Sequence, residues 1–225
     1  MIYTIPTKRG LGIELWGTYD DLRSLYDIIS KFWNQEGYLK NKGFSNRDEL
    51  ISGFSYELRK SYEGDRLKRE SSHFSHRQDE YFGCQFSWVQ LLFSLTALRY
   101  NMRFFESSKL DISIFLQLEY WIENSMERYD EVGSKPLKYF INDGIHAAND
   151  FIYQFMRSIN YDYFLLGGGK KAFRKLPQLL NRAVLFSEDY KKYLDFLTQE
   201  ALSLKCEISE LEINDDNFDY ERVQW

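Results

Sequence analysis

Residues 84–105, CQFSWVQLLFSLTALRYNMRFF, are apolar on every side when they are arranged as a helix. One side carries, at helical spacing, Trp88, Leu91, Leu92, Leu95, Leu98 and Met102. The opposite side carries Phe86, Val89, Phe93, Ala97, Tyr100 and Phe104. A helix with no polar face is normally buried by other elements. We therefore predict that residues 84–105 form a central helix around which the rest of the chain packs.

The composition is that of a globular protein with a thick core. The chain has 225 residues, of which 44% are hydrophobic, 28% charged and 18% aromatic. Aromatic side chains bury large areas, and a chain of this length can bury a sizeable core. Neither a repeat nor a convincing linker divides the sequence. We predict a single domain over residues 1–225, of the α+β class and predominantly α: a bundle of about six helices around the central helix, with a small antiparallel β-sheet or hairpin from the N-terminus.

Charge and hydropathy argue against several classes of protein. The uncharged part of residues 84–105 is shorter than the ~20 apolar residues of a membrane span, and Arg99 and Arg103 interrupt it. The formal net charge of −5 argues against general nucleic-acid binding, which needs a basic surface. The polar start, MIYTIPTKRG, shows no signal peptide and predicts a cytoplasmic protein. Cys84 and Cys206 have no metal-ligand spacing, and we expect neither a metal nor a cofactor.

The N-terminal part of the chain carries strand signals. Residues 2–5 and 12–16 are β-prone runs that flank a turn-rich connection at 6–10, which predicts a β-hairpin. Two strands alone are marginally stable and need further strands or helix cover. The charged stretch 65–83 has two interpretations, a solvated loop or a second hairpin that pairs with the first. The run Glu80-Tyr81-Phe82 favours the hairpin.

Capping residues and helix breakers divide the remaining chain into helices. We expect helices to start at Thr18, Ser45 (with Asp48 completing a capping box), Ser107 or Ser108, Ser134 and Pro177, and to stop at Gly64 and at Gly167–Gly169. Apolar positions keep helical phase over residues 137–159, with a possible kink at Gly144, and over a last helix at 190–204. Residues 207–213 alternate in polarity like an edge strand that could return to the N-terminal sheet.

The segment at 167–175 is the best candidate for an anion site. Successive glycine N–H groups can form a concave nest, and several cations follow them. The residues concerned are Gly167, Gly168, Gly169, Lys170, Lys171, Arg174 and Lys175. The GxxxxGK[ST] spacing of a Walker loop is missing. The alternative is a flexible helix terminator followed by a solvated basic turn.

Two groups with acidic side chains would each share one helix face: Asp143, His146 and Asp150, and Glu119, Glu123 and Glu127. In both groups the apolar residues of the same helix lie on the opposite face from the acidic side chains. Metal sites in helical bundles project inward, so the first group is expected to face water. The second group is expected to form a solvated helix face.

A short motif after the second helix resembles a nuclease signature. The gap between Arg66 and His73 fits the Arg-x(4–6)-His pattern of HEPN-type ribonucleases. That pattern belongs on a helix, whereas the stretch that contains His73 and His76 has no helical stripe. The simpler interpretation is a pair of exposed loop histidines.

The sequence ELRKSYEGDR at 57–66 contains a polar cluster made of Arg59, Tyr62, Glu63 and Arg66. Arg59 and Glu63 are four residues apart and can pair on a helix. Arg99 emerges from the buried central helix, where an arginine needs a carboxylate partner. We expect a structural Arg–Glu network between the second helix and the central helix. A ligand pocket built on the same groups is the alternative.

Four segments, PTKRGLGIELWG, YELRKSYEGDR, LRYN and GGGKKAFRKLP, together resemble an uncharacterised bacterial family of unknown function. The resemblance covers most of the chain, implies a bacterial cytoplasmic protein and carries over no catalytic residue. Three hypotheses follow. The favoured one is a non-catalytic interaction protein that acts through a helical surface or a sheet edge, as a homo-oligomer or with a protein partner. Its grounds are the missing catalytic motifs, the abundant aromatic residues and the possible edge strand at 207–213. The others are an enzyme or sensor that binds a phosphorylated ligand through residues 167–175, and a metal-dependent or HEPN-like nuclease.

Overall fold

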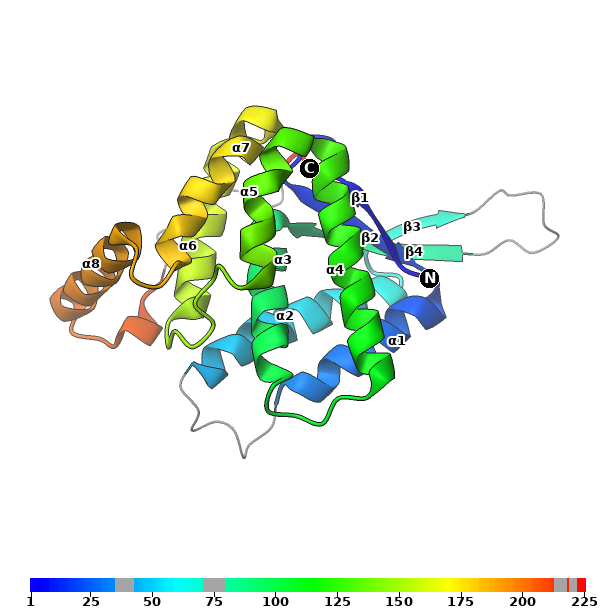
Figure 1. The fold of residues 1–225 in the computed structure, drawn as a ribbon, viewed down its shortest axis with the longest axis horizontal. Helices are drawn as coiled ribbons and strands as arrows, with labels where there is room; N and C mark the ends of the chain where they lie inside the picture. Colours follow the sequence, from blue (N-terminus) through cyan, green and yellow to red (C-terminus); the bar gives the residue numbers. More distant parts are fainter. Residues whose placement is uncertain (35–42, 71–79, 213–217, 219–221) are drawn as a thin grey trace.

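A computed structural model describes residues 1–34, 43–70, 80–212, 218 and 222–225. Within these residues the chain forms eight α-helices and four strands (Figure 1). The α+β, mostly helical class predicted from the sequence is confirmed, with eight helices rather than about six. No helix in this part of the chain is both long and apolar enough to cross a membrane.

The four strands form one antiparallel sheet in the order β1–β2–β4–β3. Their bounds are Tyr3–Pro6 (β1), Gly12–Gly17 (β2), Leu67–Glu70 (β3) and Glu80–Ser87 (β4). The first two strands are the predicted N-terminal hairpin. The charged stretch after the second helix contributes β3 and the start of β4, so its described residues from Leu67 onward are strands that join the N-terminal hairpin, as favoured above.

The strand β4 leads directly into α3 (Trp88–Asn101), the buried helix at the centre of the molecule. Ser87 caps α3, because its Oγ accepts a hydrogen bond from the N–H of Gln90 at 3.0 Å. From Trp88 to Leu98 every residue of α3 except Gln90 is buried, which confirms the expected burial. The predicted start at residue 84 is wrong, because residues 84–87 pair with β2 and complete the sheet.

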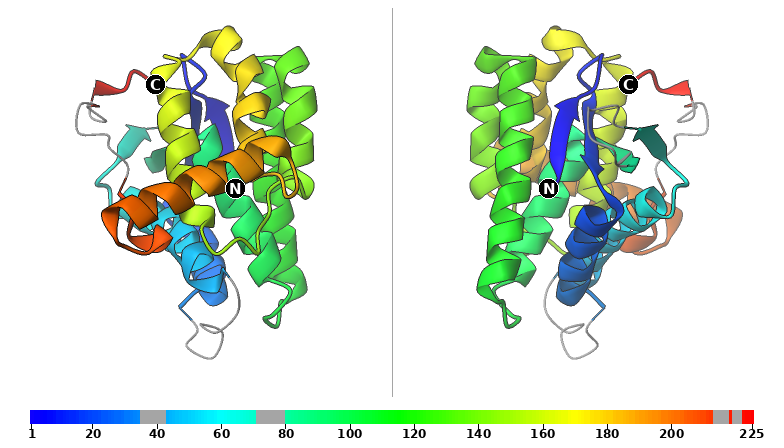
Figure 2. Two further views of the ribbon diagram at one scale, coloured as in Figure 1. Left: turned by 90° about the vertical axis from the view of Figure 1, so that its left-hand side faces the viewer. Right: turned by 90° about the vertical axis from the view of Figure 1, so that its right-hand side faces the viewer.

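Among the other helices of the described chain, α2, α5 and α6 pack directly on α3, and α8 lies at the edge of the molecule next to η3 and η4 (Figures 1 and 2). α1 lies against α2, α4 lies beside α5 and packs on β1, and α6 and α7 pack on each other while α6 also contacts α3. Their bounds are Tyr19–Ile29 (α1), Phe44–Tyr62 (α2), Lys109–Tyr129 (α4), Glu131–Asn142 (α5), Ile152–Leu165 (α6), Gly169–Leu180 (α7) and Glu188–Leu204 (α8). Short 3-10 turns occupy Ser30–Phe32 (η1), Asn181–Ala183 (η3) and Ile208–Glu210 (η4).

Two of the predicted helix starts are confirmed, and three are wrong. Thr18 and Ser108 each form a capping box with the aspartate three residues later. The wrong starts are those at Ser45, Ser134 and Pro177, because α2 starts after Gly43, α5 after Asp130 and α7 after Gly168. Asp130 anchors the start of α5, where its carboxylate accepts two hydrogen bonds from Arg174, at 2.6 and 3.0 Å.

The long helix predicted over residues 137–159 is two helices, not one kinked helix. α5 ends at Asn142 and α6 begins at Ile152, with a connection at 143–151 between them. Asp143 leaves the helical conformation (φ −160°), and Asn149 accepts a hydrogen bond from the N–H of Phe151.

The predicted edge strand at 207–213 is also wrong over its described residues. Ile208–Glu210 is a 3-10 turn that packs next to α8, and the carbonyl of Ser209 accepts a hydrogen bond from Gln154 of α6. The segment therefore lies against helices and is not part of the sheet. Residue 213 lies outside the described part of the chain.

Candidate functional site

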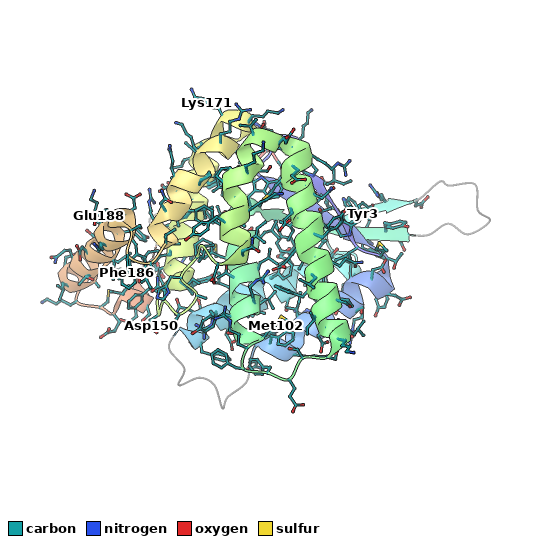
Figure 3. All side chains as sticks on the ribbon, in the orientation of Figure 1. Tyr3, Met102, Asp150, Lys171, Phe186 and Glu188 are labelled. Carbon is teal, nitrogen blue, oxygen red and sulfur yellow. The ribbon has the colours of Figure 1, made fainter. Side chains whose placement is uncertain are left out.

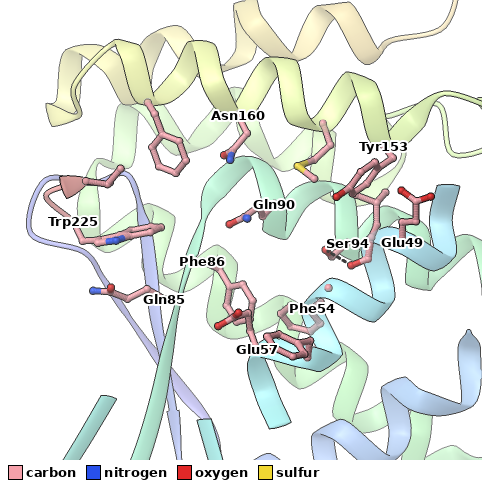
Figure 4. A pocket seen from close by; sticks show the side chains of 16 residues that line it. Glu49, Phe54, Glu57, Gln85, Phe86, Gln90, Ser94, Tyr153, Asn160 and Trp225 are labelled. Atoms are coloured by element: carbon pink, nitrogen blue, oxygen red, sulfur yellow. Dashed lines mark hydrogen bonds between the residues drawn. The ribbon is translucent and has the colours of Figure 1, made fainter. Parts of the chain in front are cut away.

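A cavity of about 400 Å³ lies between four elements and the last residues of the chain (Figure 4). Its walls come from α2, β4, α3 and α6, and Val223 and Trp225 line one edge. These elements meet here because β4 and α3 are continuous and α2 and α6 both pack against α3. The cavity therefore borders the central helix.

Aromatic side chains cover much of the cavity wall. Phe54 and Phe86 are buried, and their ring centroids are 4.6 Å apart. On the opposite side the ring of Trp225 packs edge-on against Phe164, with 5.8 Å between centroids. Residues 222–225 are further anchored to the body by a hydrogen bond of 2.9 Å from Arg9 to Gln224. The result is an apolar surface suited to the body of a small organic molecule.

A short hydrogen-bond network fixes two carboxamide groups at the cavity. The N–H of Ser87 donates to Oε1 of Gln90 at 3.1 Å, and the Ser87 hydroxyl, which accepts from the N–H of Gln90, donates to Oδ1 of Asn160 at 2.5 Å. The oxygens of both carboxamides are therefore engaged by Ser87, which is fully buried. Each side chain is held in one orientation by its oxygen.

The amide nitrogens of Gln90 and Asn160 remain available to a ligand. Neither Nε2 of Gln90 nor Nδ2 of Asn160 has a hydrogen-bond partner in the described part of the chain. Neither nitrogen is among the fully buried polar atoms that lack a partner, so both reach accessible space. Figure 4 shows both side chains reaching into the cavity, Gln90 from α3 and Asn160 from α6. Two donors from different helices thus face one space.

The cavity wall on α2 carries two carboxylates. Glu57 accepts hydrogen bonds of 2.7 and 2.9 Å from Arg66, and this pairing holds the pKa of the Arg66 guanidinium above its ordinary value. Glu49 lies two turns earlier on the same helix. Because Arg66 balances Glu57, the cavity is close to neutral at that end.

The comparison with known proteins concerns the whole chain. A family described as a domain of unknown function (DUF6904) matches residues 2–225. The chain belongs to the DUF6904 family. No curated protein and no solved structure matches it. The DUF6904 match includes every element that lines the cavity, from α2 to Trp225.

In the DUF6904 chain the residues of the predicted polar cluster do not form one network. Arg59 and Glu63 form an exposed pair on α2, 4.0 Å apart. Arg99 instead pairs with Glu119 of α4, at 2.5 Å, so the expected network between α2 and the central helix is wrong in its partner. Glu119 is only 6% exposed, which also corrects its predicted solvated position. Burial raises the pKa of Glu119, and the charge of Arg99 opposes that rise.

Tyr62 packs in the core, and Glu123 and Glu127 lie at the surface of α4. The ring of Tyr62 is buried and packs edge-on against Tyr19 and Tyr26. Glu127 is exposed and pairs with Lys138 at 2.5 Å, as a solvated helix face would allow. Glu123 lies one turn before it, half-buried at the surface of α4.

Sequence reasoning missed the most deeply buried charge in the described chain, Arg47. Its side chain has no exposed surface, donates to Oδ1 of Asn101 at 2.7 Å and to the carbonyl of Ala147 at 2.8 Å, and lies 4.4 Å from the centroid of the Tyr100 ring. Burial lowers the pKa of Arg47, against the opposing influence of Tyr100 and nearby carboxylates. A signal was present, because Arg47 falls in the apolar stripe that continues to Leu50.

The glycine-rich basic segment at 167–175 does not line the cavity. Gly167, Gly168 and Gly169 all have positive φ, from 73° to 85°, and α7 starts at Gly169. The N–H of Gly169 donates to the carbonyl of Arg9, and Arg174 is engaged by Asp130. Lys170 and Lys171 are exposed, and Figure 3 shows Lys171 projecting from the end of the molecule. Anion binding at this segment stays a prediction.

The residues proposed for metal or nuclease chemistry do not form a centre in the described structure. Asp143, His146 and Asp150 lie in the connection at 143–151 and not on one helix face. The described residues contain no group of three or more His, Cys, Asp or Glu side chains that could hold a metal ion. His73 and His76 lie outside the described residues.

Proposed function

We propose that this DUF6904 protein is a non-catalytic binding protein for a small organic molecule that has a flat apolar body and a hydrogen-bond acceptor. An aromatic amide or a heterocycle with a ring nitrogen or carbonyl has this chemistry. The ligand would occupy the cavity between α2, β4, α3 and α6.

The observation that carries the proposal is the convergence of two oriented amide donors on an aromatic cavity. Nε2 of Gln90 and Nδ2 of Asn160 are without protein acceptors among the described residues, while Ser87 holds both carboxamide oxygens. Donors that are fixed before binding cost little entropy when a ligand arrives. A carbonyl oxygen placed between them has two lone pairs and would accept one hydrogen bond from each helix, whereas a ring nitrogen would accept from one of the two amides.

The size and composition of the cavity agree with a ligand site. A volume of about 400 Å³ lies within the ~300–1,000 Å³ range of small-molecule pockets, which are mostly apolar with a few oriented polar groups. The half-buried rings of Tyr153 and Trp225 supply apolar surface against which a flat ring can pack, and Phe54 and Phe86 are each 3% exposed.

Gly53 supports a ligand on the α2 side of the cavity. It lies in the interior of α2, lines the cavity, and has no heavy atom within 4 Å of the place where a Cβ would sit. Glycine in a helix interior costs roughly 0.5–1 kcal/mol relative to alanine, and nothing in the fold requires it here. Gly53 is exposed, so its absent side chain leaves open space where the cavity meets solvent on the α2 side.

Binding without catalysis is the simpler role for these groups. Carboxamides do not act as acids or bases near neutral pH and are not nucleophiles. The Glu57 carboxylate in the wall is already paired with Arg66. Burial raises the pKa of the second wall carboxylate, Glu49, but among the described residues no lining side chain forms a hydrogen bond with it, so recognition of a molecule is the role we propose for the cavity.

A fragment titration tests this proposal. Nicotinamide, benzamide and adenine serve as probes, and binding is measured by saturation-transfer NMR and calorimetry. We expect at least one probe to bind the wild type at millimolar concentration or better, and Gly53→Leu to weaken that binding at least about tenfold, because the added side chain fills the space next to the cavity.

The matched control is Ser52→Leu, which places the same leucine side chain at the preceding position of α2. Ser52 does not line the cavity. It should bind the probes as the wild type does. The proposal is wrong if none of the probes binds the wild type, or if Gly53→Leu and Ser52→Leu bind equally well.

A further inference from the structure

The outer face of α4 carries a stripe of exposed apolar side chains. Ile112, Leu116 and Tyr120 are 43%, 52% and 59% exposed and follow one another at four-residue steps. Each such step turns a helix by only about 40°, so the three side chains share one face. The opposite face of the helix is buried against the body. The α4 stripe is thus apolar surface that the described chain leaves uncovered.

Opposite charges flank the α4 stripe at equal distances. Lys109 lies three residues before Ile112, and Glu123 lies three residues after Tyr120, both on the same face. Among the described residues neither Lys109 nor Glu123 forms an ion pair within 4.0 Å; Lys138 of α5 pairs with Glu127 and interacts with Glu123 only at longer range. The stripe therefore has a basic end, an apolar middle and an acidic end.

This order makes the stripe complementary to itself. When two copies meet with their α4 helices antiparallel and a two-fold axis at Leu116, Leu116 meets Leu116 and Ile112 meets Tyr120 of the other copy. The same axis brings Lys109 opposite Glu123, twice per interface, as an isologous contact requires. A parallel arrangement would instead place Lys109 against Lys109 and Glu123 against Glu123, which is repulsive.

We infer that α4 is a homodimer interface in which two copies of this chain pair antiparallel about Leu116. Apolar side chains at the centre with charged side chains at the rim match the anatomy of protein interfaces. Because α4 does not line the cavity between α2, β4, α3 and α6, the dimer leaves that cavity open. The dimer and the proposed ligand site are independent of each other.

Charge reversal tests the geometry. Sedimentation velocity of the full chain should show a concentration-dependent dimer at or below about 100 µM. Leu116→Glu should weaken dimerisation at least about tenfold, because it places two carboxylates at the axis. Lys109→Glu and Glu123→Lys should each weaken it about fivefold, because each turns two rim pairs into like-charge pairs. The double variant K109E/E123K restores opposite charges and should recover wild-type dimerisation.

The matched control is Leu202→Glu, an equally simple change at an exposed leucine of α8 (67% exposed). It should leave dimerisation unchanged, and circular dichroism checks that every variant is folded. A wild type that stays monomeric at this concentration overturns the inference. A dimer that survives Leu116→Glu, or a double variant no better than the single charge reversals, overturns it as well.

Discussion

Replacing Arg47 by methionine is expected to cost about 2–4 kcal/mol of unfolding free energy. The guanidinium donates to Asn101 and to the Ala147 carbonyl, and its centre lies 4.4 Å from the Tyr100 ring centroid. Methionine keeps the packing of the apolar stem but leaves two buried oxygens without their donor, each at a cost of about 1–3 kcal/mol. Removing the charge returns part of its desolvation cost, which is why the sum is smaller than the two losses at their maximum.

The loss should extend beyond one helix. Asn101 also donates to the carbonyl of Phe32 at 2.9 Å, so Arg47 and Asn101 together join α2, the end of α3, η1 and the connection at 143–151. Without the guanidinium, the Asn101 side chain loses the partner of its oxygen. Amide hydrogen exchange in the connection at 143–151 should accelerate in the variant.

Urea unfolding followed by circular dichroism measures the effect. Arg59→Met, on the exposed side of the same helix, is the control and should change the unfolding free energy by less than about 0.5 kcal/mol. If the unfolding free energy falls with urea concentration at a similar slope in both variants, they expose similar surface on unfolding and their free energies can be compared directly. If Arg47→Met is as stable as the wild type, the buried hydrogen bonds contribute no net stability and the reasoning fails.

Stability should depend on Asp130 in acid, because hydrogen bonds from Arg174 hold the pKa of its carboxyl below the ordinary 3.8. That contribution to the unfolding free energy is complete above the unfolded-state pKa and is lost as the pH falls through the lower folded-state pKa. Asp130→Asn should therefore lose less unfolding free energy than the wild type between about pH 5 and pH 2. Equal losses in both proteins, measured by urea unfolding at each pH, would contradict this. Burial raises the pKa of the Cys84 thiol, so a thiol reagent should label the half-buried Cys206 first in the native protein, and equal labelling rates by mass spectrometry would speak against a buried Cys84. If residues 167–175 bind an anion, millimolar phosphate should raise the melting temperature and Lys171→Ala should reduce the shift; no shift in the wild type removes that hypothesis.

Local patterns predicted the elements better than their ends. Residues 84–87 alternate between apolar (Cys84, Phe86) and polar (Gln85, Ser87) side chains, as a strand does. Phe86 also falls at helical spacing with Val89 and Phe93, so helical periodicity placed the run on the wrong side of the boundary. The Ser87-x-x-Gln90 spacing is a capping box and could have placed the helix start. At 143–151 the apolar residues continue the helical spacing of α5 although the helix has ended, so the spacing gave no sign of the end of α5.

The cavity could not be predicted from the sequence, because its residues come from segments far apart in the chain. Gln90, Asn160 and Trp225 each look unremarkable alone, and only the packing of α6 on α3 and the return of the last residues bring them together. The partner of Arg99 was missed for the same reason. Sequence reasoning correctly required a carboxylate there, but the tertiary fold supplied Glu119 from α4.

The side-chain NH₂ resonances of Gln90 and Asn160 give the most direct test of the proposed site. In a titration of ¹⁵N-labelled protein with any probe that binds, both NH₂ pairs should shift together and saturate with the same dissociation constant, since each amide donates to the ligand. The assignments come from Gln90→Glu and Asn160→Asp, which delete one pair each. A probe that saturates the protein while both NH₂ pairs stay in place would contradict the account.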